Sequence, residues 1–164
     1  MRHVLLVTRN FAPTSHVSVE RAIKLAKYLP EFGWRPTVLT GDPPTAGLPS
    51  DLELLEQVRG IEVLKARAPE FSLFYRRVTR GAPAEGQVRL RSSPRRGPWH
   101  PKAWLVPDSQ ALWYPFAVRA AVRAAPRARW DAVVATSFPP TALLIGRAVA
   151  KRLGIPYVAD FRDA

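Results

Sequence analysis

Two kinds of hydrophobic pattern alternate along the chain. Residues 3–8 (HVLLVT) and 35–40 (RPTVLT) are short runs dense in apolar or β-branched residues, which is typical of strands covered on both faces of a parallel sheet. Between them, apolar residues recur at helical spacing after Ser18, a predicted helix cap, and Gly33 provides a stop. The first forty residues therefore predict a strand–helix–strand unit.

The same alternation continues to the end of the chain, where Gly60 and Gly154 each close a helix and precede a strand. A capping-box pattern, Ser50 to Glu53, opens the next predicted helix. The predicted helices are residues 51–58, a stretch from Asp108 or Ser109 to Arg129 that Pro115 breaks or restarts, and 141–153, with 69–80 also compatible with a helix; the predicted strands are 61–66, 131–135 and 155–159.

Strands that alternate with helices predict an α/β fold: a Rossmann-like, doubly wound, mainly parallel sheet in a single domain. An antiparallel α+β sheet is the alternative. No crossover element follows the last predicted strand, although parallel strands are normally followed by one. We therefore expect residues 1–164 to be a truncated part of a longer protein.

Composition narrows the class of protein. The 164 residues contain 17 Pro and no Cys, which excludes a disulfide scaffold, a zinc–thiolate site and a cysteine nucleophile. A hydrophobic fraction of 47% is too high for a disordered basic tail. No apolar run is long enough to span a bilayer, and no signal peptide is evident. The expected location is the cytoplasm, with attachment to the inner face of the membrane left open.

The net charge of +12 is concentrated in one segment. Residues 76–102 carry eight basic side chains against one acidic, and their Pro and Gly content predicts a loop inserted in the domain. Two interpretations stay open: a patch for anionic partners, above all a membrane surface, or a solvated loop that keeps the protein soluble. The pattern disfavours nucleic acid, because the charge is concentrated in one loop and no basic helix or aromatic sheet face of the recognised nucleic-acid-binding kinds is evident. The proposed patch comprises Arg76, Arg77, Arg80, Arg89, Arg91, Arg95 and Arg96.

Ligands of open α/β sheets bind at the carboxyl ends of the strands, and polar residues follow several of the predicted strands. The loop after the first strand lacks glycine, so the fingerprint that brings a dinucleotide close to the backbone is absent, as is a phosphate-binding P-loop. We expect no bound cofactor and no metal. The candidates in this loop are Asn10, Thr14, Ser15 and His16, and His16 is either a base or simply exposed.

Two further strand ends carry candidate residues. Thr136, Ser137, Pro139 and Pro140 join a strand to a helix start, where free N–H groups hold an anion or sugar hydroxyls, or where the hydroxyls simply cap the helix. Asp160, Arg162 and Asp163 are the densest group of charges and are the catalytic candidates, because a carboxylate there can accept a proton from an acceptor hydroxyl. An Arg–Asp pair that braces the loop is the alternative.

Four segments, taken in order, resemble the N-terminal domain of family 4 glycosyltransferases of the GT-B fold. They are HVLLVTRNFAP, SVERAIKLAKYLPEFGWRPTVLTGD, LVPDSQALWYPFAVRAA and WDAVVATSFPPTALLIGRAVAKRLGIPYVADFRDA. The resemblance is greatest to a bacterial subgroup with a terminal "DFRDPW" signature, onto which Asp160, Arg162 and Asp163 map.

This resemblance implies a retaining transfer of a sugar from a nucleotide-sugar to an acceptor in glycan or cell-envelope biosynthesis. It implies two Rossmann-like domains that face each other across a cleft. This chain would be the acceptor-side half, inactive alone, and the nucleotide-sugar co-substrate would bind mainly to a donor-side domain absent from these residues. The loop from Asn10 to Ser18 corresponds to the family's flexible loop near the donor phosphates and acceptor, which is a sugar or a lipid-linked molecule.

Overall fold

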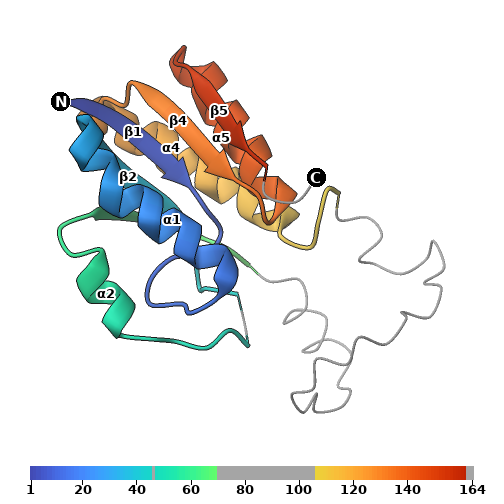
Figure 1. Ribbon diagram of the computed structural model, residues 1–164. Coiled ribbons are helices and arrows are strands. Elements are labelled where there is room, and N and C mark those ends of the chain that lie inside the picture. The colour runs from blue at the N-terminus through green and yellow to red at the C-terminus, as the bar shows by residue number, and fades with distance from the viewer. Residues whose placement is uncertain (46, 70–105, 162–164) are drawn as a thin grey trace.

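A computed structural model describes residues 1–45, 47–69 and 106–161 (Figure 1). The basic segment from Arg76 to Lys102, all but the first residue of the stretch 69–80 that is compatible with a helix, and Arg162 and Asp163 lie outside these residues. In chain order the elements are β1 (Arg2–Val7), α1 (Val17–Tyr28), the 3₁₀ turn η1 (Leu29–Phe32), β2 (Trp34–Asp42), α2 (Glu53–Gln57), β3 (Glu62–Arg67), the 3₁₀ turn η3 (Ala111–Trp113), α4 (Tyr114–Ala128), β4 (Ala132–Thr136), α5 (Pro140–Leu153) and β5 (Tyr157–Asp160).

The five strands form one sheet in the order β3-β2-β1-β4-β5, and every neighbouring pair is parallel. At the centre, Val4 of β1 aligns with Pro36 of β2 on one side and with Ala132 of β4 on the other. From β1 the chain adds β2 and β3 on one side of the sheet. It then returns to the other side of β1 and adds β4 and β5, so the direction of the strand order reverses at β1. The prediction of a Rossmann-like, doubly wound parallel sheet is therefore confirmed.

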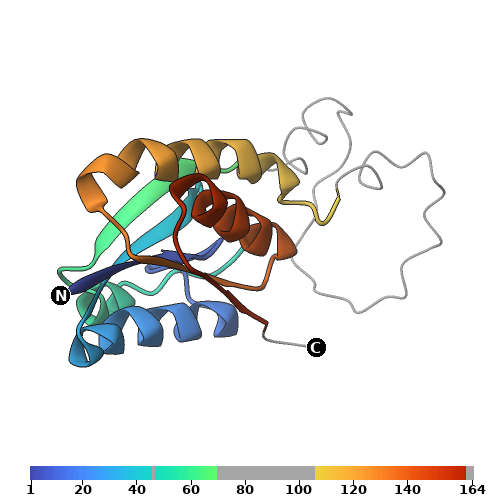
Figure 2. The ribbon, with the colours of Figure 1, turned by 90° about the horizontal axis from the view of Figure 1, so that it is seen from above.

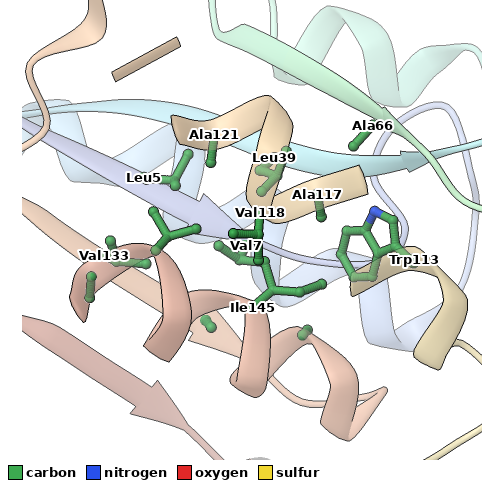
Figure 3. Packing of buried hydrophobic residues seen from close by; sticks show 14 of the residues in the cluster. Leu5, Val7, Leu39, Ala66, Trp113, Ala117, Val118, Ala121, Val133 and Ile145 are labelled. Atoms are coloured by element: carbon green, nitrogen blue, oxygen red, sulfur yellow. The ribbon is translucent and has the colours of Figure 1, made fainter. Parts of the chain in front are cut away.

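Helices cover both faces of the sheet (Figure 2). On one face, α4 and α5 pack against alternate residues of β1 and β4, among them Leu5, Val7 and Val133, which are fully or almost fully buried (Figure 3). On the other face, α1 packs on Val4 and Leu6, together with Val58 beside α2. Burial on both faces explains why strand β1 reads as an uninterrupted apolar run.

The ends of the elements follow from local chemistry. Helix α4 begins one residue before Pro115, so this proline restarts a helix after η3, at a position where its missing N–H costs little. Helix α1 begins at Val17, one residue before the predicted cap at Ser18, and the N–H of Val19 donates to the carbonyl of His16. Gly33 and Gly154 adopt left-handed φ values of 78° and 67° and end η1 and α5, as their positions predict.

Candidate functional site

The carboxyl ends of β1 and β4, where the strand order reverses, lie side by side (Figure 1). In open α/β sheets a ligand-binding crevice forms outside this reversal point. The loops that follow β1, β2 and β4, together with the segment leading into α4, meet there. Two polar networks organise this edge, one centred on Arg9 and the other on Asp160.

The first network is built around the buried guanidinium of Arg9, whose residue is only 1% exposed. Its Nε donates to Oε1 of Gln110 at 2.8 Å, and its NH1 donates to the carbonyl of Pro43 at 3.1 Å. Its Cζ lies 5.8 Å from the centroid of the Trp113 ring, a distance that suits a cation–π contact. One side chain thus joins the loop after β1 to the loop after β2 and to η3.

Space for Arg9 comes from Gly41 in strand β2. A Cβ atom placed on Gly41 would overlap the Arg9 guanidinium and would lie 2.9 Å from the Cβ of Ala68. The main chains also meet here, since the carbonyl of Arg9 accepts hydrogen bonds from the Gly41 N–H and from the Thr40 hydroxyl, both at 3.1 Å. The glycine is therefore needed for close approach at this point.

Asp108 continues the network to helix α5. Its Oδ2 accepts hydrogen bonds from the N–H of Thr141 at 2.7 Å and from the Thr141 hydroxyl at 2.8 Å. Its Oδ1 accepts the Gln110 N–H at 2.7 Å. A carboxylate at this end of a helix satisfies a free donor and interacts favourably with the helix dipole. The anchor for α5 therefore comes from a residue 33 positions earlier in the chain, which sequence patterns interpreted as a helix start.

The second network is the ion pair between Arg21 of α1 and Asp160 at the end of β5. The Nε of Arg21 donates to Oδ2 of Asp160 and its NH2 donates to Oδ1, both at 2.7 Å. The Arg21 side chain is 54% exposed and that of Asp160 15%. The hydrogen bonds to this carboxylate raise the pKa of the Arg21 guanidinium further above its ordinary value. The two hydrogen bonds thus orient the Asp160 carboxylate, while one edge of the pair faces solvent.

The candidates of the first loop serve mainly to connect two loops. Oδ1 of Asn10 accepts the N–H of Thr45 at 2.9 Å. Thr14 is buried and forms an isolated antiparallel bridge with Ser50, and the N–H of Ser15 donates to the carbonyl of Pro49 at 2.8 Å. Only His16 presents an exposed side chain among these four candidates.

The candidates between β4 and α5 lie at the reversal point itself. Thr136 and Ser137 are buried, and the Ser137 N–H donates to the carbonyl of Asp160 at 3.0 Å, which ties this loop to the end of β5. Pro140 lies in the first turn of α5, as the sequence predicts. Pro139 occupies the cap position, so the alternative that a hydroxyl side chain stands there as the cap is wrong. The predicted free donors of Thr141 are already bound by Asp108, so they are not available to an anion in this structure.

Sequence patterns singled out Asp160 but missed four residues that position this edge. Arg21 lies within α1, and Arg9 comes two residues after the end of β1. Asp108 and Gln110 both precede η3. The nearest signal is the place of Arg9 at the end of a strand. The partners of the other three are distant in sequence and become visible only in the folded chain.

We also searched the described residues for cavities, metal sites and membrane-spanning helices. A cavity of about 520 Å³ follows α1 from Val17 to Phe32 and includes Arg21 in its wall, so it runs along the helix rather than over the strand ends. No group of three or more His, Cys, Asp or Glu side chains suited to a metal ion occurs within residues 1–45, 47–69 and 106–161. Across the same residues, none of the helices is both long and apolar enough to cross a membrane.

Comparisons with known proteins give a likeness of fold. No family model and no curated protein matches the sequence. Among solved structures, the chain is similar to CalG4, the calicheamicin glycosyltransferase, with a TM-score of 0.57 and 20% identity over 98% of this chain and 32% of that chain. It is also similar to MurG of Acinetobacter baumannii, with a TM-score of 0.52 and 19% identity over 98% of this chain and 35% of that one.

Both similar proteins are GT-B glycosyltransferases. At these identities the likeness shows that this chain has the fold of one Rossmann-like unit of such enzymes. The chain spans about a third of the length of the solved structures it matches.

Proposed function

We propose that this chain is the acceptor-side half of a retaining, family 4-like glycosyltransferase of the GT-B type. The proposed reaction moves a sugar from a nucleotide-sugar to a sugar or lipid-linked acceptor in glycan or cell-envelope synthesis. Three observations support it: the parallel sheet with its reversal at β1, the fold likeness to two GT-B glycosyltransferases, and the four ordered segments of the sequence. The expected setting is the cytoplasm, including the inner face of the membrane.

The observation that carries the proposal is the carboxylate of Asp160, which Arg21 orients at the strand-end edge. Both of its oxygens accept hydrogen bonds from Arg21, and an ionised carboxylate acts only as a hydrogen-bond acceptor. An acceptor hydroxyl that donates to this carboxylate would be fixed in orientation, and its oxygen would become a better nucleophile as the proton shifts toward the carboxylate. Asp160 is therefore the proposed acceptor-binding and catalytic residue.

The remaining candidates have supporting roles in this proposal. Arg9, Asp108 and Gln110 fix the three loops around the reversal point, so that the acceptor meets a preformed edge. His16, which is exposed just before α1, is proposed to contact the acceptor or the donor phosphates. Arg162 and Asp163 follow directly after the described residues and remain predicted members of the site.

The donor half of the reaction belongs to residues outside this chain. Because the chain spans about a third of the structures it resembles, we propose that the nucleotide-sugar binds mainly to a second Rossmann-like domain. The nucleotide-sugar is a co-substrate, and the proposal includes neither a bound cofactor nor a metal. The isolated chain is then expected to transfer no sugar.

The test uses the protein expressed from its complete reading frame. Nucleoside diphosphate release is measured with a panel of nucleotide-sugars and acceptors, and product anomers are assigned by NMR. Asp160→Asn keeps the size and the hydrogen-bonding capacity of the side chain but removes its basicity, so we expect kcat to fall by about 10²-fold or more. The matched control is Asp51→Asn, because Asp51 caps α2 by accepting the Glu53 N–H and lies away from the ion pair.

Absence of transfer with every donor would contradict the proposed activity. Full turnover by Asp160→Asn in an otherwise active enzyme would instead remove Asp160 from the catalytic role and leave the activity in place. A product of inverted anomeric configuration would exclude the retaining mechanism.

A further inference from the structure

Helices α4 and α5 lie side by side on one face of the sheet (Figure 2). Their exposed residues include six cations. Helix α4 carries arginines at positions 119, 123 and 127, a spacing of four that places them on one side of the helix. Helix α5 adds three cations in its second half. All six side chains are exposed: Arg119, Arg123, Arg127, Arg147, Lys151 and Arg152, which together we call the α4–α5 face.

No acidic residue belongs to either of these helices, so the α4–α5 face carries a charge of +6 with no internal compensation. The opposite face of the sheet is different. There α1, η1 and α2 together carry three basic and four acidic side chains, a net charge of −1. One face of the described part of the domain is therefore strongly basic, and the helices of the other face are nearly neutral. This basic face is separate in sequence from the basic segment of residues 76–102.

Among the residues that the structure describes, exposed apolar side chains border the α4–α5 face at the end where the two helices begin. Leu112 and Phe116 precede the arginines of α4, and each is 39% exposed; Leu144 precedes the cations of α5 and is 43% exposed. Phe161, beside the end of β5, is 69% exposed. A hollow of about 300 Å³ lies between Leu144 and Phe161, lined almost wholly by apolar side chains, and Arg147 forms part of its wall.

We propose that the α4–α5 face binds the surface of an anionic lipid bilayer. The six cations would contact lipid phosphates, each contributing through attraction to the negative surface potential. Leu112, Phe116, Leu144 and Phe161 would enter the boundary between headgroups and acyl chains, as the apolar side of an interfacial helix does. The combination favours lipid over a nucleic acid, because phosphodiester backbones offer no apolar layer for the aliphatic side chains.

This orientation has a consequence for the site. Both α4 and α5 begin at the carboxyl edge of the sheet, and the exposed apolar residues lie at those beginnings. Bilayer binding would therefore bring the edge that holds Asp160 close to the membrane surface. The inference itself requires no sugar transfer, so it stands or falls separately from the proposed function.

The experiment measures sedimentation of the 164-residue chain with vesicles of phosphatidylcholine and phosphatidylglycerol, and with vesicles of phosphatidylcholine alone. We expect binding to the anionic vesicles only, weakened by added salt. One variant replaces the three arginines of α4: Arg119→Gln, Arg123→Gln, Arg127→Gln. Glutamine keeps the helix propensity of these positions. Because each cation should contribute about fivefold, the partition coefficient should fall about 100-fold. Arg147→Gln, Lys151→Gln, Arg152→Gln should lower it to a similar extent.

The matched control removes three cations from the opposite face: Lys24→Gln, Lys27→Gln, Arg59→Gln. It makes the same change in net charge and leaves residues 76–102 intact, so it should retain wild-type binding to within about threefold. Leu144→Ser should weaken binding about tenfold at both low and high salt, because it removes an apolar contact rather than a charge. Circular dichroism melts confirm that each variant is folded.

Three outcomes would overturn the proposal. Equal binding to neutral and anionic vesicles would remove its electrostatic basis. An equal loss in the control and in the α4 triple variant would show that net charge matters and the face does not. Duplex DNA that displaces the chain from vesicles at equal phosphate concentration, with Leu144→Ser binding that DNA like wild type, would assign the face to polyanions instead.

Discussion

Arg21 on helix α1 and Asp160 at the end of strand β5 form a two-pronged ion pair, with both nitrogen–oxygen distances at 2.7 Å, although 139 residues separate them in sequence. The pair fastens the first helix of the domain to its last strand. It also fixes the one carboxylate that we propose to face the acceptor. Its energetic strength can be measured apart from any catalytic role.

A double-mutant cycle of Arg21→Gln and Asp160→Asn should give a coupling free energy of about 0.5–1 kcal/mol at low salt. The value is modest because more than half of the Arg21 side chain is exposed, and solvent screens exposed pairs. Urea unfolding of the four proteins measures it, and added salt should reduce the coupling. A coupling indistinguishable from zero at low salt would mean that the pair is not maintained in solution.

Removal of the Asp108 carboxylate should loosen the start of helix α5. Asp108→Ala deletes the acceptor for two Thr141 groups and for the Gln110 N–H, so we expect a loss of about 1–2 kcal/mol in the free energy of unfolding. Hydrogen exchange at the Thr141 amide should become faster. Asp108→Asn, which keeps one acceptor oxygen, should cost less.

The comparison for this prediction is Asp51→Ala. Asp51 caps the five-residue helix α2 through a single bond to the Glu53 N–H, which is exposed to solvent. Removal of the Asp51 carboxylate should lower the free energy of unfolding by about 0.5 kcal/mol, which is at the low end of the range for helix caps. Equal losses at the two positions would contradict the assignment of Asp108 as the anchor between η3 and α5.

Gly41→Ala should destabilise the protein by about 2 kcal/mol, because the new Cβ would overlap the buried Arg9 guanidinium. Arg9 cannot withdraw without breaking its bonds to Gln110 and Pro43. The double variant Gly41→Ala, Arg9→Ala removes the overlap, and its loss should therefore be smaller than the sum of the two single losses by at least about 1 kcal/mol. Strict additivity in chemical unfolding would argue against the close approach.

Tyr157 should make stability depend on pH in the alkaline range. Burial raises the pKa of its phenol above the ordinary value of 10.0, opposed in part by Arg147, and the hydroxyl donates to the carbonyl of Leu143 at 2.8 Å. The folded state thus favours the neutral phenol. The stabilisation that the neutral Tyr157 phenol gives to the folded state is fully present below about pH 10. It declines as the pH rises above the pKa that Tyr157 has in the unfolded chain.

Tyr157→Phe tests this dependence. Near neutral pH the variant should be less stable by about 1 kcal/mol, because the hydrogen bond to Leu143 is lost. The difference between wild type and variant should shrink above about pH 10, where the wild-type phenol ionises on unfolding. Unfolding curves at several pH values measure it, and a difference that stays constant to the highest pH would contradict the raised pKa.

Much of the fold could be predicted because its signals are local. The apolar run at β1 reflects burial on both faces, and the left-handed turns at Gly33 and Gly154 end their elements where glycine stands in the sequence. Pro140 opens α5 where a proline fits best. Most boundaries shifted by one or two residues, as at β5, where pairing begins at Tyr157 rather than Ile155. The stretch predicted to be helical from Asp108 or Ser109 is an exception, because α4 begins only at Tyr114, after the turn η3.

The candidate site could be predicted only in part. The rule that ligands bind at the carboxyl ends of strands indicated the edge at which we propose the site, and it singled out Asp160, which lies at the end of β5. The partners could not be read from spacing, because Arg21 meets Asp160, and Asp108 meets Thr141, across long stretches of chain. Thr14, predicted as a contact in the loop, is instead buried in a bridge with Ser50.

The sequence by itself determined the alternation of strands and helices, the parallel class of the sheet and the edge where polar residues gather. These features depend on periodicity, turn residues and strand order along the chain, which are local properties. Only the tertiary structure decided which charges compensate one another. Arg21 is paired across the fold, Arg9 is buried against Gly41, and Arg119, Arg123 and Arg127 are left exposed on one face, because charge balance depends on distances in space rather than on separation in sequence.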